Sequence, residues 1–402
     1  MKKLLLLTLS AISISFASHA QFSEFADDTS AIKMTIGNSS MQLGGRLSGY
    51  YENRALKAGV TKMSHNGWAL KDADIDMLGK TTSNFTYEFH ISLADIVAAA
   101  ATQNTANPAN PGFKAAYFSY DGFKVNIKFG YDKLPYALGS IVAEHLSPMW
   151  SHVNLNGGDL FSRRDFGLTL NTMLMDNHIN LYAGAYSGMG ENFFEYGNDA
   201  SGTFEYVGRA EYCLTGKMKY RIIDEEVSQK PQVRVAINGR YEDKTQPAGQ
   251  VIGVDAPGMY GLRIINGKRS IIGGDCSFLY KGFSASFEAH MMKLQPASTS
   301  DPLYNGTLAS VNNGVVNAGG YVANVNYNYE KIHSAFSVMY ESVNVNDLVP
   351  GNQEWLYLGY AYKVSGFNSV AKLEWYIPTK EDVTSNPLKY TSQVRIGYQI
   401  VF

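Results

Sequence analysis

Apolar and polar residues alternate with a period of two over stretches of about ten residues, and this pattern constrains the fold most strongly. The clearest example is FKVNIKFGY at residues 123–131, where aromatic and aliphatic residues alternate with Lys124, Asn126 and Lys128. Residues 84–94 and 390–402 repeat the pattern. Because successive side chains of a strand point to opposite faces, each segment predicts a β-strand with one apolar and one polar face.

Sixteen segments carry this alternation. They span roughly residues 41–51, 68–78, 84–94, 114–120, 123–131, 164–174, 178–187, 204–214, 232–241, 270–280, 283–293, 319–329, 332–341, 353–362, 367–377 and 389–402. Short turns such as Asp121-Gly122 and Lys281-Gly282 alternate with long polar stretches such as residues 95–113 and 342–352. An all-β fold is therefore predicted: a transmembrane, antiparallel up-and-down β-barrel of about 16 strands, with short periplasmic turns and long extracellular loops.

The strands of a soluble β-sandwich or propeller would also alternate between apolar and polar residues. The segments here approach ~9–11 residues, the length that crosses a bilayer at a tilt. Aromatic residues such as Tyr120, Phe123, Tyr280 and Phe283 crowd the segment ends, as in the aromatic girdles of membrane barrels. No internal repeat is apparent, which disfavours a propeller. Residues 215–231 are too long for a short turn, and we expect them to extend their strands beyond the membrane.

Composition excludes several other classes. Charged residues make up 17% of the chain, against about 25% in a typical soluble domain. Mean hydropathy is −0.17, which disfavours a bundle of membrane-spanning helices. The formal net charge of −2 is unlike that of a nucleic-acid-binding protein, so no nucleic-acid partner is expected. Only Cys213 and Cys276 are present, and we expect two unpaired cysteines on strands.

The N-terminus has the pattern of a secretory signal peptide over residues 1–20. Lys2 and Lys3 precede an apolar stretch, and Ser18-His19-Ala20 offers small residues at a cleavage site. The apolar stretch is too short to span a bilayer. Residues 21–402 are then expected to form a single barrel domain in the bacterial outer membrane, because backbone groups in lipid must be satisfied internally.

A barrel of sixteen strands leaves an aqueous channel, whereas smaller barrels are filled by their own side chains. Several asparagines fall on inward positions, namely Asn126, Asn171, Asn180, Asn324, Asn326 and Asn328. A wet lumen tolerates such a set more easily than a dry core. These features predict a porin for passive diffusion of small hydrophilic solutes, with no cofactor. The alternative is a structural or adhesive protein whose barrel only anchors its loops.

The longest predicted connection covers residues 132–163. It contains Pro135, Pro148, Trp150 and an apolar patch at 137–143, so we expect it to be folded. One expected position is inside the lumen as a constriction, and the other is on the surface against neighbouring loops. The candidate constriction residues are Lys133, Glu144, His145, Arg163 and Arg164.

The strand registers also predict the charged residues that line the lumen. The candidates are Arg46, Asp72, Asp74, Asp76, Glu88, Lys124, Lys128, Arg209, Arg234, Arg240 and Arg395, together with Lys372 and the acids Asp165, Glu205, Glu211, Asp275, Glu288, Glu341 and Glu374. Inward acids outnumber inward bases in this set. A general or weakly selective pore is therefore the favoured interpretation.

The sequence lacks three motifs of metal sites and enzymes. The series Asp72-x-Asp74-x-Asp76 begins like a calcium loop, but Met77 and Ser83 replace the glycine and glutamate that such a loop requires. The histidines show no H-E-x-x-H or other close ligand spacing. No G-x-S-x-G nucleophile elbow is present. Neither a metal site nor an enzyme is therefore expected.

Three short segments resemble the phosphate-selective porin O and P family. They are LGGRLSGYYENR around Arg46, AAYFSYDGFKVNIKFGYDKLPY with Gly130, Lys133 and Pro135, and FSRRDFGLTL with Arg163, Arg164 and Gly167. The final Phe402 is similar to the terminal signal that barrel-assembly machinery reads. The resemblance implies a sixteen-stranded barrel in outer-membrane lipid, often a homotrimer, with loops folded inward. Anions such as phosphate would be its solutes, although Asp72, Asp74 and Asp76 stand where the family commonly has basic residues.

Overall fold

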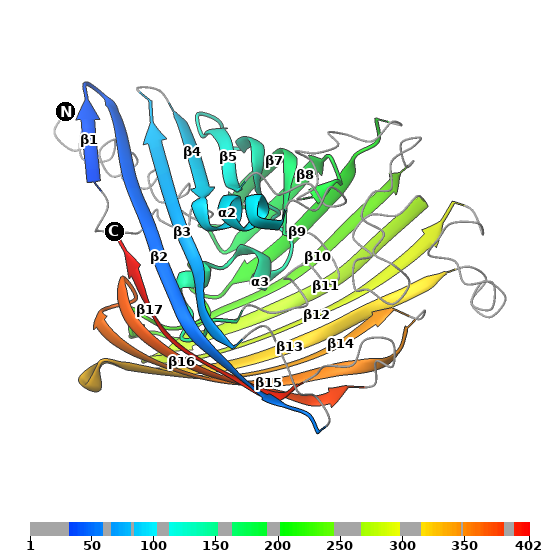
Figure 1. Ribbon diagram of the computed structural model, residues 1–402. Coiled ribbons are helices and arrows are strands. Elements are labelled where there is room, and N and C mark those ends of the chain that lie inside the picture. The colour runs from blue at the N-terminus through cyan, green and yellow to red at the C-terminus, as the bar shows by residue number, and fades with distance from the viewer. Residues whose placement is uncertain are drawn as a thin grey trace.

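The strands close into a barrel (Figure 1). The computed structural model describes residues 32–58, 66–81, 84–102, 112–151, 163–190, 202–244, 267–297, 315–346, 349–381 and 390–402. Within these residues seventeen strands form one antiparallel sheet, and the pairing of β17 (Tyr390–Val401) with β2 (Ser39–Leu56) closes it. The predicted signal peptide lies outside the described residues.

Sixteen strands, β2 to β17, make the barrel wall, as predicted. Between β2 and β17 they are β3 (Gly67–Lys80), β4 (Phe85–Ser92), β5 (Phe113–Tyr120), β6 (Asn126–Lys133), β7 (Arg164–Leu174), β8 (Ile179–Tyr186), β9 (Glu205–Cys213), β10 (Gln232–Lys244), β11 (Gly267–Tyr280), β12 (Phe283–Pro296), β13 (Val316–Tyr329), β14 (Ser334–Asn346), β15 (Val349–Ser365) and β16 (Ser369–Glu381). Each of the sixteen predicted segments overlaps one of these strands.

The predicted alternation of faces is visible in the exposure of the side chains. On β10, Ile237 is 70% exposed on the outer face, whereas the neighbouring Asn238 is buried on the inner face. Ile75 and Asp74 show the same contrast on β3. An apolar outer surface with a polar interior is the pattern of a barrel that crosses a membrane.

One strand was not predicted. The short strand β1 (Ile32–Ile36) pairs with the first residues of β2 through a turn at Gly37 and Asn38. It continues the line of β17, and Phe402, which directly follows β17, exchanges backbone hydrogen bonds of 2.7 and 2.9 Å with Gly45. Residues 32–36 alternate as Ile-Lys-Met-Thr-Ile, but five residues are only about half the length of the segments on which the strand prediction was based.

Some predicted boundaries were wrong. β6 begins at Asn126, so residues 123–125 form bends instead of strand. β14 and β15 continue through most of the predicted loop at residues 342–352. The helix α2 (Leu93–Thr102) follows β4 in the stretch expected to be an irregular loop. No helix among the described residues is long and apolar enough to cross a membrane.

The two cysteines are unpaired, as expected. Cys213 is buried on the inner face of β9, and Cys276 is exposed on the outer face of β11.

The barrel has one end with mostly short connections, the short-turn end, and an opposite long-loop end. One connection from each end has described residues that are buried in the barrel interior. The inward loop, residues 134–151, follows β6 and contains α3 (Leu138–Ile141) and the 3-10 turn η2 (Glu144–Leu146). The inward turn, residues 214–231, joins β9 to β10 and forms no strand, so the expected strand extension was wrong. Figure 1 shows α3 within the barrel.

Candidate functional site

The candidate site is the barrel interior, and the inward loop crosses it. At one end of the loop, the Tyr136 hydroxyl lies 2.8 Å from Nδ1 of His290, and the Gly139 amide donates to Glu288 at 2.8 Å. Both partners are on β12. At the other end, the Ser151 amide and hydroxyl donate to Glu374 on β16 at 2.6 and 2.7 Å. The loop, which leaves the wall at β6, therefore reaches across the interior to β12 and β16, each six strands away from β6.

Apolar contacts hold the same loop. Leu134, Tyr136, Ala137 and Met149 are buried together with inward side chains of the wall, which include Tyr186, Val207, Ile271, Met292, Val322, Met339 and Tyr357. Trp150 lies beneath the Lys372 ammonium, whose Nζ is 5.2 Å from the ring centre. Burial of this many apolar side chains makes the loop part of the barrel interior instead of a surface feature.

The candidate constriction residues lie at the roots and in the middle of the inward loop. Lys133 ends β6 and donates to the Val142 carbonyl at 3.0 Å. Glu144 forms an ion pair with Arg163. His145 is buried, and its carbonyl accepts hydrogen bonds from Lys372 and Gln399. Arg164 is buried at the start of β7.

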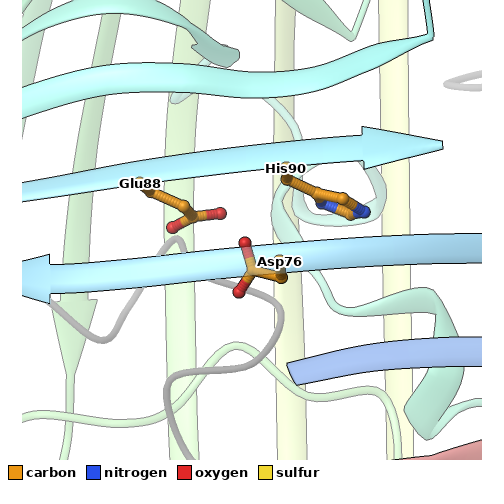
Figure 2. Close-up of side chains that lie close together, drawn as sticks. All are labelled: Asp76, Glu88 and His90. Carbon is orange, nitrogen blue, oxygen red and sulfur yellow. The ribbon is translucent and has the colours of Figure 1, made fainter. Parts of the chain in front are cut away.

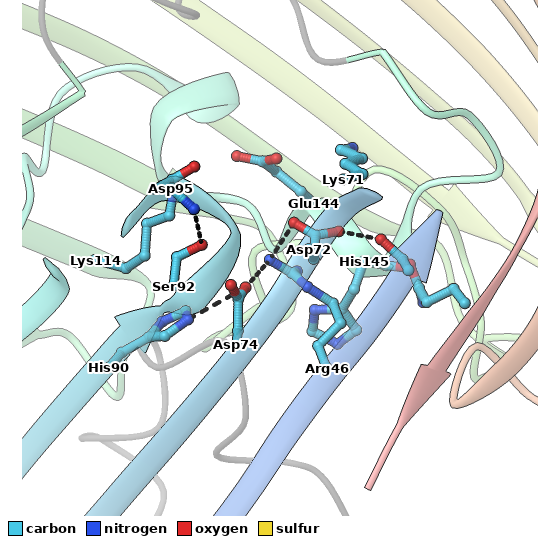
Figure 3. A network of polar contacts seen from close by, with 12 residues as sticks. Arg46, Lys71, Asp72, Asp74, His90, Ser92, Asp95, Lys114, Glu144 and His145 are labelled. Atoms are coloured by element: carbon cyan, nitrogen blue, oxygen red, sulfur yellow. Dashed lines mark hydrogen bonds and ion pairs between the residues drawn. The ribbon is translucent and has the colours of Figure 1, made fainter. Parts of the chain in front are cut away.

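On β2 to β4 the predicted lining residues form a connected network (Figure 3). Arg46 donates to Asp72 at 3.1 Å and to Asp74 at 2.7 Å. Asp74 also lies 3.4 Å from Nε2 of His90. These charges are compensated mainly by side chains of the adjacent strands.

A second network covers β9 to β11. Arg209 makes hydrogen bonds of 2.6 and 2.8 Å with the two oxygens of Asp275 and also contacts Glu211. Arg240 makes an equivalent paired contact with Glu205 at 2.6 and 2.8 Å. Paired guanidinium–carboxylate contacts are strong and geometrically defined. These arginines are therefore not free to attract anions with their full charge.

Of the remaining predicted lining residues, three lie inside the barrel and one does not. Lys128 is buried and pairs with Asp132. Arg395 contacts Glu52 at 2.9 Å and Glu374 at 3.3 Å. Arg234 is fully buried and stacks 4.2 Å from the ring centre of Tyr220 in the inward turn. The prediction that Lys124 lines the lumen was wrong. Lys124 is exposed in the bends before β6, because the strand begins two residues later.

Several interior charges were missed because the strands run past their predicted ends. Glu52, Glu242, Lys244 and Arg269 all lie just outside the predicted segments and are buried. Arg269 contacts Glu242 at 2.7 Å and Glu205 at 3.3 Å. The signal was present in the sequence, because Arg240, Glu242 and Lys244 continue the alternation of β10 by two more inward positions.

Asp76, Glu88 and His90 form a compact group on β3 and β4 (Figure 2). Asp76 and His90 are register partners, and Glu88 lies two residues before His90 on the same face. One oxygen or nitrogen atom of each side chain lies within 4.8 Å of the others, and all three side chains are buried. Two carboxylates and an imidazole are ligand types that bind divalent cations. Pairing across two strands created the group, so ligand spacing along the chain could not reveal it.

The chain is similar to known proteins in both sequence and fold. Residues 41–144 match the sequence model of the phosphate-selective porin O and P family. The fold is also shared with solved structures, one of which is the outer membrane channel DcaP of Acinetobacter baumannii. That match has a TM-score of 0.56 and 11% identity, and covers 92% of this chain and 99% of that one. The fold is that of an outer-membrane porin.

Two further porin structures extend the comparison. OmpF of Salmonella typhi has a TM-score of 0.54 and 12% identity, with 92% of this chain and 100% of that chain covered. The trimer form of OmpT of Vibrio cholerae has a TM-score of 0.52 and 8% identity, with coverage of 90% and 99%. No curated protein sequence matches the chain significantly. The porin-like barrel thus extends well beyond the segment that carries the family match.

Proposed function

We propose that the protein is an outer-membrane porin that lets small hydrophilic solutes diffuse through its lumen. The observation that carries this proposal is the closed sixteen-stranded barrel with an apolar exterior, a charged interior and a folded loop across that interior. Barrels of this strand number leave room for an aqueous channel, and a loop inside the lumen narrows it. The inward loop is the constriction in this proposal.

The proposed pore is general or weakly selective. The matching family is named for phosphate selectivity. Here, however, Arg46, Arg209, Arg240 and Arg395 each contact a carboxylate. A paired guanidinium offers less attraction to a passing phosphate than an unpaired one. Carboxylates between the arginines also repel anions, so the interior favours neither sign strongly.

Conductance of the purified protein in a planar lipid bilayer tests the proposal. We expect stable, ohmic steps, and a reversal potential in a potassium chloride gradient close to that of an unselective pore. A protein that inserts without conducting would favour a barrel that only anchors its loops. A strong preference for phosphate over chloride would overturn the weak selectivity while leaving the pore intact.

The environment of the barrel is part of the same proposal. The apolar outer face would contact outer-membrane lipid after export by the signal at residues 1–20, and the terminal strand with Phe402 would be read by the barrel-assembly machinery. A homotrimer is proposed from the family resemblance, and OmpT, which shares the fold, is described as a trimer. Gel mobility before and after boiling tests the barrel, and cross-linking in detergent tests the trimer.

A further inference from the structure

The inward turn is anchored at the short-turn end of the barrel. Asp224 accepts hydrogen bonds from the Ser228 amide at 2.9 Å and from the Gly282 amide at 2.8 Å. Its carbonyl accepts a hydrogen bond of 3.1 Å from the Asn328 side chain. These contacts tie the turn to the β11–β12 connection and to the end of β13.

From this anchor the turn reaches inner-wall residues of several strands. The Ile222 carbonyl accepts hydrogen bonds from Ser284 of β12 at 2.9 Å and from Asn326 of β13 at 2.7 Å. The Tyr220 hydroxyl lies 2.6 Å from Glu211 of β9 and 3.0 Å from the hydroxyl of Tyr182 on β8. The segment thus extends between β8–β9 and β12–β13 inside the barrel.

The inward turn also meets the inward loop. Tyr220 and Ile222 pack against Leu138, Ile141 and Val142 around α3. One residue further along, Ile223 is fully buried in a cluster that includes Leu146 of the loop, Ala335 and Ala361 of the inner wall, and Phe367 of the β15–β16 turn. The loop enters from the long-loop end and the turn from the short-turn end, so the two segments close on each other within the lumen.

A cavity remains beside this contact. It has a volume of about 40 Å³ and is lined by Leu138 and Val142 of the loop, Ile222 of the turn, and Glu288, Asn324 and Met339 of the wall. Ile222 therefore borders this space from the side of the inward turn.

We propose that residues 214–231 are a second constriction element, which narrows the short-turn half of the lumen and sets the size limit for permeating solutes together with the inward loop. The inference rests on the proposed pore function. Tyr220 and Ile222 are the size-determining residues. Their side chains fill space that a plain hairpin turn would leave to water.

Two variants test the proposal. Ile222→Ala shortens one side chain and retains the backbone carbonyl that Ser284 and Asn326 bind. Tyr220→Ala combined with Ile222→Ala removes both side chains, together with the hydroxyl contacts of Tyr220 to Glu211 and Tyr182. Gln229→Ala is the matched control, because Gln229 lies in the same turn but is exposed. Gel mobility before and after boiling establishes that each variant has folded.

Single-channel conductance and the rate of liposome swelling in sugars of increasing size are the readouts. We expect the double variant to conduct at least about twofold more than the parent and to admit larger sugars, with Ile222→Ala intermediate and Gln229→Ala unchanged. A parent that is silent beside a conducting double variant would also support the constriction. Equal conductance and an equal size limit in folded parent and variants would overturn it while leaving the pore in place. Silence of every protein would refute the pore and this inference with it.

Discussion

Arg209 and Asp275 are joined by two hydrogen bonds of 2.6 and 2.8 Å, although their strands, β9 and β11, are separated by β10. Both side chains are fully buried. The pair therefore links three neighbouring strands on the inner face of the barrel. Removal of one partner would leave the other as an uncompensated buried charge.

Arg209→Met should strongly destabilise the barrel for this reason. We expect a loss of about 3–5 kcal/mol in the free energy of unfolding, because Asp275 and Glu211 lose their shared cation. The measurement is urea-induced unfolding in detergent micelles. Lys268→Ala is the control: its 3.9 Å contact with Asp243 is exposed, so its loss should cost at most about 1 kcal/mol. Similar losses for the two variants would contradict the assigned role of the buried pair.

The outer face should tolerate charge poorly. Ile237 is 70% exposed near the middle of β10, so Ile237→Arg would place a cation against lipid at a cost of about 2–4 kcal/mol. Met175 is equally accessible at 73% but lies in the turn after β7. Met175→Arg should therefore fold into lipid vesicles as the parent does. Equal folding yields for the two variants would count against a membrane position for β10.

The acidic group on β3 and β4 should influence ion selectivity. Asp76→Asn combined with Glu88→Gln removes two negative charges from the inner wall, so the permeability ratio of chloride to potassium should rise by about twofold. The reversal potential in a salt gradient measures that ratio. Asp176→Asn is the control, because Asp176 is exposed in the β7–β8 turn. An unchanged ratio in the double variant would show that solutes do not pass this part of the wall.

Glu225 should give the inward turn a dependence on pH. Burial raises the pKa of Glu225 above its ordinary value of 4.5, aided by the charges of Glu226 and Glu330, and outweighs the opposing charges of Arg221 and Lys363. The folded state then holds the proton more tightly than the unfolded state does. The stabilisation is present below pH 4.5 and is lost as the pH rises through the raised pKa. Glu225→Gln should remove this pH-dependent loss of stability. Thermal unfolding of the parent and the variant between about pH 3 and pH 7 measures the difference.

Glu330 lies at the same end of the barrel and should have the opposite dependence of stability on pH. Partial burial would raise its pKa, but hydrogen bonds from Lys363 and Asn328 outweigh burial and lower the pKa below 4.5. Its stabilisation is present above pH 4.5 and is lost as the pH falls through the lowered pKa. Glu330→Gln should therefore lower the free energy of unfolding near neutral pH and leave it unchanged in acid. Parallel pH profiles for the two glutamine variants would contradict these assignments.

The candidate site was partly accessible from the sequence. Arg209, Asp275 and Glu205 were placed on inward positions by counting along their strands, and the structure buries all three. Which carboxylate each arginine meets could not be read, because Arg209 passes over a strand to reach Asp275. The group of Asp76, Glu88 and His90 was also invisible, since it depends on the register between β3 and β4.

By itself the sequence determined the barrel, its strand number and the face to which most side chains point. The physical reason is that a strand repeats every two residues, so alternation along the chain records which face meets water or lipid. Only the tertiary structure decided what occupies the lumen. The contact of Ile222 with Leu138 and Val142 joins segments from opposite ends of the barrel. Such a contact depends on side-chain packing between distant parts of the chain, and it leaves no period in either segment.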